Sequence, residues 1–253
     1  MSAPRGAAAR PTVPCTAYAR SLDYIQQIRK TPIVVNDSRG FYTSRVFGTA
    51  TNEAITMLAE GVKPALVENM ARMAGLPVGP LAAVDEVTLE LVYKIGQETA
   101  QAMGKQYPTD QGQEAIRRMV EDLDRKGKRF GAGFYDYPTD AKKQLWPGLA
   151  KEFPPSDEQP PVDELIKRLL YIQALETARC FEEGVITHPQ DGDIGSILGW
   201  GFPAWTGGTL SLIDTVGIRE FVAECDRMAQ SHGPRFTVSH WLRDRAQQNL
   251  TFH

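Results

Sequence analysis

The stretch TPIVVNDSRGFYTSRV, residues 31–46, decides how this chain is interpreted. Three consecutive apolar residues at 33–35, bounded by a proline and an asparagine, are typical of a short strand buried on both faces. A strand is therefore predicted over residues 31–36, followed by a turn over residues 36–40. Because a lone strand cannot satisfy its own backbone hydrogen bonds, this one belongs to a sheet whose other strands the sequence does not supply.

Helical patterns dominate on both sides of this stretch. Upstream, apolar residues recur at helical spacing over residues 17–29, with Thr16 as the expected N-cap. Downstream, prolines and glycines mark the ends of the helical segments. Helices are predicted over residues 41–60, 64–74, 80–103, 111–125, 162–183, 191–198, 210–214, 218–231 and 238–248. The buried side of the third of these is expected to carry Val84, Val87, Leu91 and Ile95.

The composition is that of an ordinary globular protein. The 253 residues are 42% hydrophobic and 23% charged, with a formal net charge of −3. This charge provides no basic excess for nucleic acid, and no apolar run reaches the ~20 residues that span a bilayer. Three widely separated cysteines fit neither a disulfide framework nor a zinc ribbon, and they indicate a reducing compartment, the cytoplasm. Cys180 and Cys225 are expected as small apolar filler. A loose tail is expected over residues 1–15, which lack the apolar core of a secretory signal.

The two halves of the chain repeat motifs in the same order. The triplet EGV occurs at residues 60–62 and again at 183–185. A G-x-L pattern, with an aspartate six residues after the glycine, begins at Gly79 and again at Gly208. So long a period predicts two copies of one helical domain, separated by the proline-rich residues 153–161. The predicted domains are residues 1–36, 37–150 and 162–253.

Residues 31–46 resemble the junction in 3-hydroxyacyl-CoA dehydrogenases where the last strand of the NAD-binding domain passes into a helical C-terminal domain. The segments at residues 60–62 and 75–80 fit that helical domain, and GAGFYDY at residues 131–137 resembles the motif that closes it. GWGFPAWTGG at residues 199–208 resembles the second helical copy of multifunctional β-oxidation enzymes. Those enzymes join an enoyl-CoA hydratase to the dehydrogenase.

The resemblance implies an all-α chain of two duplicated dehydrogenase C-terminal domains, preceded by an orphan helix–strand from the NAD-binding domain. It implies NAD as the family cofactor, an acyl-CoA as the substrate, and oxidation of 3-hydroxyacyl-CoA to 3-oxoacyl-CoA in fatty-acid β-oxidation. The sequence lacks the G-x-G-x-x-G turn that binds the pyrophosphate of NAD, and it lacks the hydratase part. None of the four histidines matches the family's catalytic base; they are His188, His232, His240 and His253. We therefore expect no tight NAD binding and no activity from the chain alone.

No catalytic or metal-binding residue is expected, but two positions carry over from the family. Ser44 stands where the family often has an asparagine that holds the substrate oxygen, so it is the substrate-binding candidate. Its hydroxyl could instead bond the backbone of its own helix. Arg129 matches a basic residue that reaches the cofactor, so it is the cofactor-binding candidate. It could instead be a solvated loop charge beside Lys126 and Lys128.

Other conspicuous residues have two interpretations each. Trp200, Phe202 and Trp205 either form a wall for an acyl chain or pack between the two helical copies. Asp85 and Asp214, at matching repeat positions, either perform acid–base chemistry or bond to backbone in turns and caps.

Three functions remain open from the sequence. The chain is a split dehydrogenase that works with a separate NAD-binding partner, a non-catalytic assembly module that binds a β-oxidation subunit, or a gene remnant. In each case, the strand at residues 33–35 is predicted to recruit a partner strand or to cause self-association.

Overall fold

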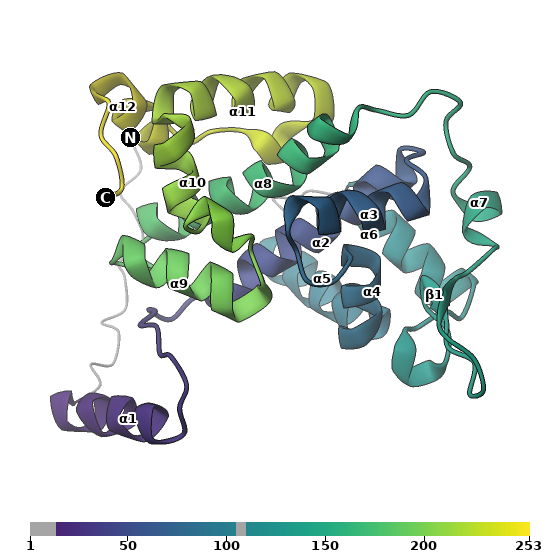
Figure 1. The fold of residues 1–253 in the computed structure, drawn as a ribbon, viewed down its shortest axis with the longest axis horizontal. Helices are drawn as coiled ribbons and strands as arrows, with labels where there is room; N and C mark the ends of the chain where they lie inside the picture. The colour runs from purple at the N-terminus through teal and green to yellow at the C-terminus, as the bar shows by residue number, and fades with distance from the viewer. Residues whose placement is uncertain (1–13, 105–109) are drawn as a thin grey trace. The chain divides into compact units, whose positions relative to one another are not determined.

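The computed structural model describes residues 14–104 and 110–253, which are mostly helical, as predicted. The chain divides into two units, residues 1–34 and residues 35–253 (Figure 1). In the first unit, helix α1 (Cys15–Gln27) follows Pro14, so Thr16 lies inside the helix and is not its N-cap. No residue of α1 is buried. The expected tail falls almost entirely on residues 1–13, outside the described residues.

The strand predicted over residues 31–36 is not formed. These residues pair with no strand in the described part of the chain, and Val34 is 37% exposed. Asn36 donates from its backbone N–H to the carbonyl oxygen of Val185 and from its side-chain amide to that of Gly184, at 2.7 Å each. The prediction was wrong because a strand needs a neighbouring strand to accept and donate its backbone hydrogen bonds.

The second unit contains the remaining elements. The helices of its first half are α2 (Thr43–Ala59), α3 (Pro64–Ala74), α4 (Pro80–Val87), α5 (Leu89–Met103), α6 (Gln111–Arg117) and the π-helical η2 (Arg118–Asp122). Those of its second half are α8 (Val162–Glu182), α9 (Pro189–Trp200), α10 (Thr209–Val216), α11 (Ile218–His232) and α12 (His240–Gln248). Shorter elements are η3 (Lys128–Phe130), α7 (Leu149–Glu152), η4 (Ala204–Thr206) and η5 (Pro234–Phe236). An antiparallel pair that the sequence patterns did not predict joins β1 (Tyr135–Asp136) and β2 (Gln144–Leu145).

Most helix ends lie within two residues of their predicted places, because proline and glycine mark them. Pro64 occupies the first turn of α3, where its missing N–H costs nothing. Gly75 ends the same helix with a φ of 107°, a conformation that glycine adopts without steric cost.

Helices α2 and α8 pack against each other at the centre of the second unit (Figure 1). Helix α2 also contacts α4, α6 and α9, whereas α8 contacts α3, α10 and α11. Their core side chains are fully buried and include Val46, Ile55, Leu58, Leu165, Leu169 and Leu175. Burying one such side chain contributes about 1.5–3 kcal/mol, so this pair of helices anchors both halves of the unit.

The helix predicted over residues 80–103 is two helices. Thr88, with a φ of 73°, separates α4 from α5, and its hydroxyl accepts a hydrogen bond from the N–H of Leu91 at 3.2 Å. Val84 is buried, as predicted. The prediction was wrong for Leu91 and Ile95, which are 47% and 53% exposed, because the break redirects α5. It was also wrong for Val87, the last residue of α4, which is 41% exposed.

A buried group of charges connects α2 to the second half. Glu53 is fully buried and accepts hydrogen bonds from Nε and Nη2 of Arg168, at 2.8 and 2.6 Å, and from Arg235. Arg168 also pairs with Glu60 at 2.8 Å. Because buried charges are stable only when paired, these contacts fix α8 and η5 against α2.

Two aspartates at matching repeat positions bind backbone in the same way. Asp85 accepts hydrogen bonds from the N–H groups of Phe134 and Tyr135, at 2.8 and 2.9 Å. Asp214 accepts from the N–H groups of Phe252 and His253, at 3.0 Å each. Both carboxylates are occupied by backbone, which supports the turn-bonding interpretation over acid–base chemistry.

A second pair of acids repeats this correspondence. The buried Glu68 accepts a hydrogen bond from the N–H of Leu81 at 2.7 Å. Asp193 accepts from the N–H of Leu210, also at 2.7 Å. Glu68 therefore binds the start of α4, whose last turn carries Asp85. Asp193 likewise binds the start of α10, whose last turn carries Asp214.

Candidate functional site

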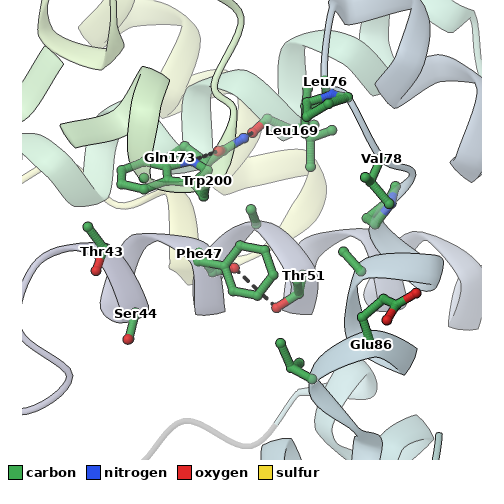
Figure 2. Close-up of a pocket in the computed structure, with 16 residues that line it drawn as sticks. Thr43, Ser44, Phe47, Thr51, Leu76, Val78, Glu86, Leu169, Gln173 and Trp200 are labelled. Carbon is green, nitrogen blue, oxygen red and sulfur yellow. Dashed lines mark hydrogen bonds between the residues drawn. The ribbon is translucent and has the colours of Figure 1, made fainter. Parts of the chain in front are cut away.

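A cavity of about 410 Å³ lies within the second unit, between α2, α4, α8 and the end of α9 (Figure 2). Its volume is within the range of ligand-binding cavities, about 300–1,000 Å³. The lining is mainly apolar. Helix α2 runs along it, and the labelled side chains on the other elements are Leu76, Val78, Glu86, Leu169, Gln173 and Trp200.

Trp200 forms one wall of this cavity and is held in place by hydrogen bonding. Its indole N–H donates to Oε1 of Gln173 at 2.9 Å, and the amide of Gln173 donates to the carbonyl oxygen of Leu169 at 2.7 Å. Gln173 is fully buried. The ring of Tyr42 contacts Trp200 edge-on, with 5.4 Å between ring centroids. The wall is therefore rigid, and its polar groups are already paired.

Tyr42 supports the wall from α2's N-terminal end without offering chemistry of its own. It is fully buried, and its hydroxyl donates to the carbonyl oxygen of Gly192 at 2.8 Å. Burial raises the pKa of this phenol well above its usual range. Tyr42 therefore stays neutral at any physiological pH.

Ser44 lies in the first turn of α2 and lines the cavity at an exposed position (Figure 2). In the described part of the chain, its hydroxyl forms no hydrogen bond, either with its own helix or with another residue. A hydroxyl can both donate and accept, so Ser44 is free to bind a ligand oxygen. The structure thus places this sequence candidate at the cavity.

Arg129 lies in η3, between two glycines, and is exposed. Its neighbours are paired, since Lys126 contacts Asp124 and Lys128 contacts Glu86 at 2.7 Å. Among the described acidic residues, none pairs with Arg129. Glu86 lines the cavity, so the loop reaches the cavity through Lys128, but Arg129 itself is not part of the lining.

The three aromatic residues of the 199–208 segment have separate roles. Trp200 lines the cavity, whereas Phe202 is 1% exposed and belongs to the core. Trp205 is 70% exposed, and its indole N–H donates to the carbonyl oxygen of Ala74 at 2.8 Å. Of the three, Trp200 alone lines the cavity, and whether it faces an acyl chain stays a prediction.

The GAGFYDY motif at residues 131–137 is held by hydrogen bonds to two acidic residues and does not line the cavity. The hydroxyl of Tyr137 donates to Oδ2 of Asp85 at 2.9 Å, and that of Tyr135 donates to Oε2 of Glu68 at 2.7 Å. Burial raises the pKa of Asp85 to about 6. Neither acid lines the cavity, so this shifted pKa reflects structural burial.

The described residues do not form a dinucleotide-binding fold of their own. A dinucleotide site needs a parallel strand that turns through glycines into a helix, and the described strands are the antiparallel β1 and β2. Within residues 14–104 and 110–253, no group of three or more histidines, cysteines or acids is placed to hold a metal ion. No helix in these ranges has the length and apolar character to cross a membrane.

Gln173 is one of the site residues that sequence reasoning missed. It lies four residues after Leu169 on a helix whose neighbouring positions are buried, and this polar residue on an apolar face was the available signal. The buried cysteines match expectation, since burial raises the pKa of Cys180 and of Cys225 to about 12 and leaves both as unreactive thiols.

Residues 40–137 match the family model for the 3-hydroxyacyl-CoA dehydrogenase C-terminal domain. The chain contains a 3-hydroxyacyl-CoA dehydrogenase C-terminal domain. The match begins at Gly40, in the junction, and ends at Tyr137, in the closing motif. The resemblance inferred from these motifs is confirmed.

Known proteins extend the similarity beyond this domain. Fatty acid oxidation complex subunit alpha from Shewanella loihica is 33% identical over 239 residues, covering 93% of this chain and 33% of its own length. The chain is homologous to that subunit and spans about a third of it.

Two solved structures share the fold. Escherichia coli K12 3-hydroxybutyryl-CoA dehydrogenase matches with a TM-score of 0.71 and 17% identity, covering 93% of this chain and 66% of its own. The dehydrogenase part of multifunctional enzyme 1 from C. elegans matches with a TM-score of 0.65 and 20% identity, covering 90% and 53%.

Proposed function

We propose that this chain supplies the substrate-closing part of a 3-hydroxyacyl-CoA dehydrogenase of fatty-acid β-oxidation. An NAD-binding domain outside its 253 residues completes the enzyme. The reaction is the NAD-dependent oxidation of a 3-hydroxyacyl-CoA to a 3-oxoacyl-CoA. The observation that carries the proposal is the mainly apolar cavity, with the unpaired Ser44 hydroxyl beside it, in a chain that contains this dehydrogenase domain.

Each candidate residue has a role in this proposal. Ser44 binds the substrate oxygen through a hydroxyl that no described residue occupies. Arg129, an exposed cation without an acidic partner in the described part of the chain, contacts the phosphate or ribose edge of NAD held by the other domain. The cavity holds the acyl chain and excludes water around the reacting carbon.

The second half of the chain, in this proposal, is a second copy of the helical domain. The motif order supports it, and so do the two pairs of equivalent acids, Asp85 with Asp214 and Glu68 with Asp193. The domains are then residues 37–150 and 162–253, and the preceding residues 16–36 belong with the NAD-binding domain.

The test follows NADH absorbance with a 3-hydroxyacyl-CoA and NAD. The purified chain, the NAD-binding domain of a related dehydrogenase, and the two together are compared. We expect NADH only from the mixture, because the sequence has no G-x-G-x-x-G turn and no histidine at the position of the family's catalytic base. No NADH from the mixture, with a folded chain, overturns the proposal.

Ser44 is tested in the same mixture. Ser44→Ala should lower kcat/KM about tenfold, the effect of losing one hydrogen bond worth about 1.4 kcal/mol. Ser44→Asn keeps a hydrogen-bonding side chain and should retain most of the activity. Ser231→Ala, at an exposed position of α11 outside the cavity, is the matched control. Equal activity of the Ser44→Ala variant and the wild type excludes the assigned role.

A non-catalytic assembly module is the second candidate function. It is favoured by the apolar surface of the first unit, where Tyr24 is 63% and Ile28 is 47% exposed. Binding to a β-oxidation subunit without affinity for acyl-CoA would support this function. A chain that binds neither would leave the gene-remnant interpretation.

A further inference from the structure

We propose that Trp200 sets the longest acyl chain that the cavity accepts. Trp200 belongs to the second half of the chain, whereas Ser44, at the exposed side of the cavity, belongs to the first half. The second half would thereby determine the substrate specificity of a site that both halves form. The inference rests on the proposed function in one respect, that the occupant is the fatty acyl chain of a CoA thioester.

The cavity has two sides that differ in chemistry. Figure 2 shows Ser44 on one side of α2, with Trp200, Gln173 and Leu169 on the other side and Phe47 between them. Ser44 is exposed, whereas Leu169 and Gln173 are fully buried. An acyl chain that enters beside Ser44 therefore passes Phe47 and ends against the side chains of α8 and α9.

The polar groups on the buried side are unavailable to a ligand. The indole N–H of Trp200 is taken by Gln173, and the amide of Gln173 is taken by Leu169, as described above. These contacts occupy the indole N–H and one N–H of the amide, so a polar occupant would find few partners there and would lose hydrogen bonds to water. Hydroxyls without a hydrogen bond among the described residues are found at Thr43 and Ser44, in the first turn of α2. This arrangement fits a ligand with a polar head and an apolar tail, as in an acyl thioester.

The side chain of Trp200 is fixed in position and does not move to make room for a longer acyl chain. Its ring is held by the buried Gln173 on one edge and contacted by the buried Tyr42, 5.4 Å away between centroids. Moving the ring would leave the amide oxygen of Gln173 without its donor. A chain too long for the cavity must therefore bend out toward solvent, where additional methylenes add no affinity.

The test measures binding of saturated acyl-CoAs, from butanoyl-CoA to hexadecanoyl-CoA, to the full chain by isothermal titration calorimetry. In the wild type, affinity should rise about fourfold per buried methylene and then become constant at a limiting chain length. In Trp200→Ala the limit should move to longer chains, so that hexadecanoyl-CoA binds roughly tenfold more tightly than to the wild type. Butanoyl-CoA should bind both proteins within about twofold, since its short chain buries no methylene at Trp200.

A second variant moves the limit in the opposite direction. Ala83 lines the cavity from α4 and is half-buried, so Ala83→Leu fills space without opening a hole in the core. The limit should shift to shorter chains. Leu198→Ala is the matched control, because Leu198 lies on α9 two residues before Trp200, is 65% exposed and does not line the cavity. Circular dichroism and thermal melting establish that each variant is folded.

An unchanged limit in Trp200→Ala overturns the role of Trp200, as does an affinity that is independent of chain length in the wild type. The same acyl series, as 3-hydroxyacyl-CoAs, is then assayed for NADH formation with the added NAD-binding domain. If NADH forms but the limiting chain length is the same in Trp200→Ala and the wild type, the specificity role of Trp200 is rejected and the proposed function is retained. A limit that moves in binding without any NADH formation rejects the proposed function and retains the cavity as an acyl-chain site.

Discussion

At the residue scale, Gly133 and Asp85 fit together with no space between them. A Cβ added to Gly133 would lie 2.0 Å from Oδ1 of Asp85, the atom that accepts the N–H of Phe134. Gly133→Ala should therefore displace the carboxylate and lower the free energy of unfolding by about 2–3 kcal/mol, as overpacking does. Urea denaturation followed by circular dichroism measures this change.

The matched control is Gly48→Ala in α2, where an added Cβ meets nothing within 4 Å. That variant should gain about 0.5–1 kcal/mol, because alanine favours the helix more than glycine does. Equal stability of Gly133→Ala and the wild type would contradict the close fit at Asp85.

The buried carboxyl of Asp85 should make stability depend on pH in a defined direction. Burial raises its pKa from the ordinary value of 3.8 to about 6. Between these values the folded chain keeps a proton that the unfolded chain releases. The contribution of this group is thus greatest below pH ~4 and declines as the pH rises to ~6, by on the order of 3 kcal/mol.

Asp85→Asn isolates this contribution, since asparagine does not titrate. The variant should be less stable than the wild type at low pH, because asparagine replaces one of the two accepting oxygens with a donor. The difference in free energy of unfolding should shrink as the pH rises from ~4 to ~6. A difference that grows, or stays constant, over this range would show that the pKa is not raised.

Single residues also show what the sequence could and could not predict. Ser44 was predicted as a candidate because its position relative to Gly40 follows a local motif. The pairing of Gln173 with Trp200 could not be predicted, because the two residues are 27 positions apart in the chain and no local pattern records such a contact.

At the element scale, the break between α4 and α5 arises from a distant contact. A Cβ on Gly127 would lie 2.9 Å from Cα of Thr88, and the N–H of Glu90 donates to the carbonyl oxygen of Lys126. The chain around Gly127 therefore fixes the turn at Thr88. Residues 80–103 have a continuous helical pattern on their own, so the sequence could not predict this break.

The charges between α2 and α8 should show strong coupling. In Arg168→Met, the buried Glu53 keeps Arg235 as its partner but loses Arg168. This loss should lower the free energy of unfolding by about 3–5 kcal/mol. Adding Glu53→Leu should restore part of this loss, because the uncompensated carboxylate is gone. Additive losses in a double-mutant cycle, measured by urea denaturation, would contradict direct pairing.

Residues 31–35, which pair with no strand in the described part of the chain, should serve as a contact for another domain or another copy. Val34→Lys places a charge on this segment at a position that is 37% exposed, so the chain's own fold should be unaffected. We expect weaker activation by the NAD-binding domain or less self-association, measured by titration and by light scattering. Unchanged behaviour in both would exclude the segment as a contact.

At the scale of the whole molecule, the sequence predicted the helical class, most helix positions and the family. Proline, glycine and helical spacing are local signals, and they sufficed for the helices. The family was indicated instead by the resemblance of motifs such as those at residues 31–46 and 131–137. The cavity could not be predicted, because it forms only where α2, α4, α8 and α9 meet. The strand prediction failed for the opposite reason, since its local pattern is clear and the neighbours it needs are not among the described residues.

The most direct test of the proposed dehydrogenase function is the initial rate of NADH formation at a fixed concentration of this chain, with increasing amounts of the added NAD-binding domain. After subtracting the rate of that domain alone, we predict zero rate without it and a saturable rise with it. A positive rate at zero added domain would show that the chain is a complete enzyme. A flat zero line, with the chain folded, would show that it is not the substrate-closing part of a dehydrogenase.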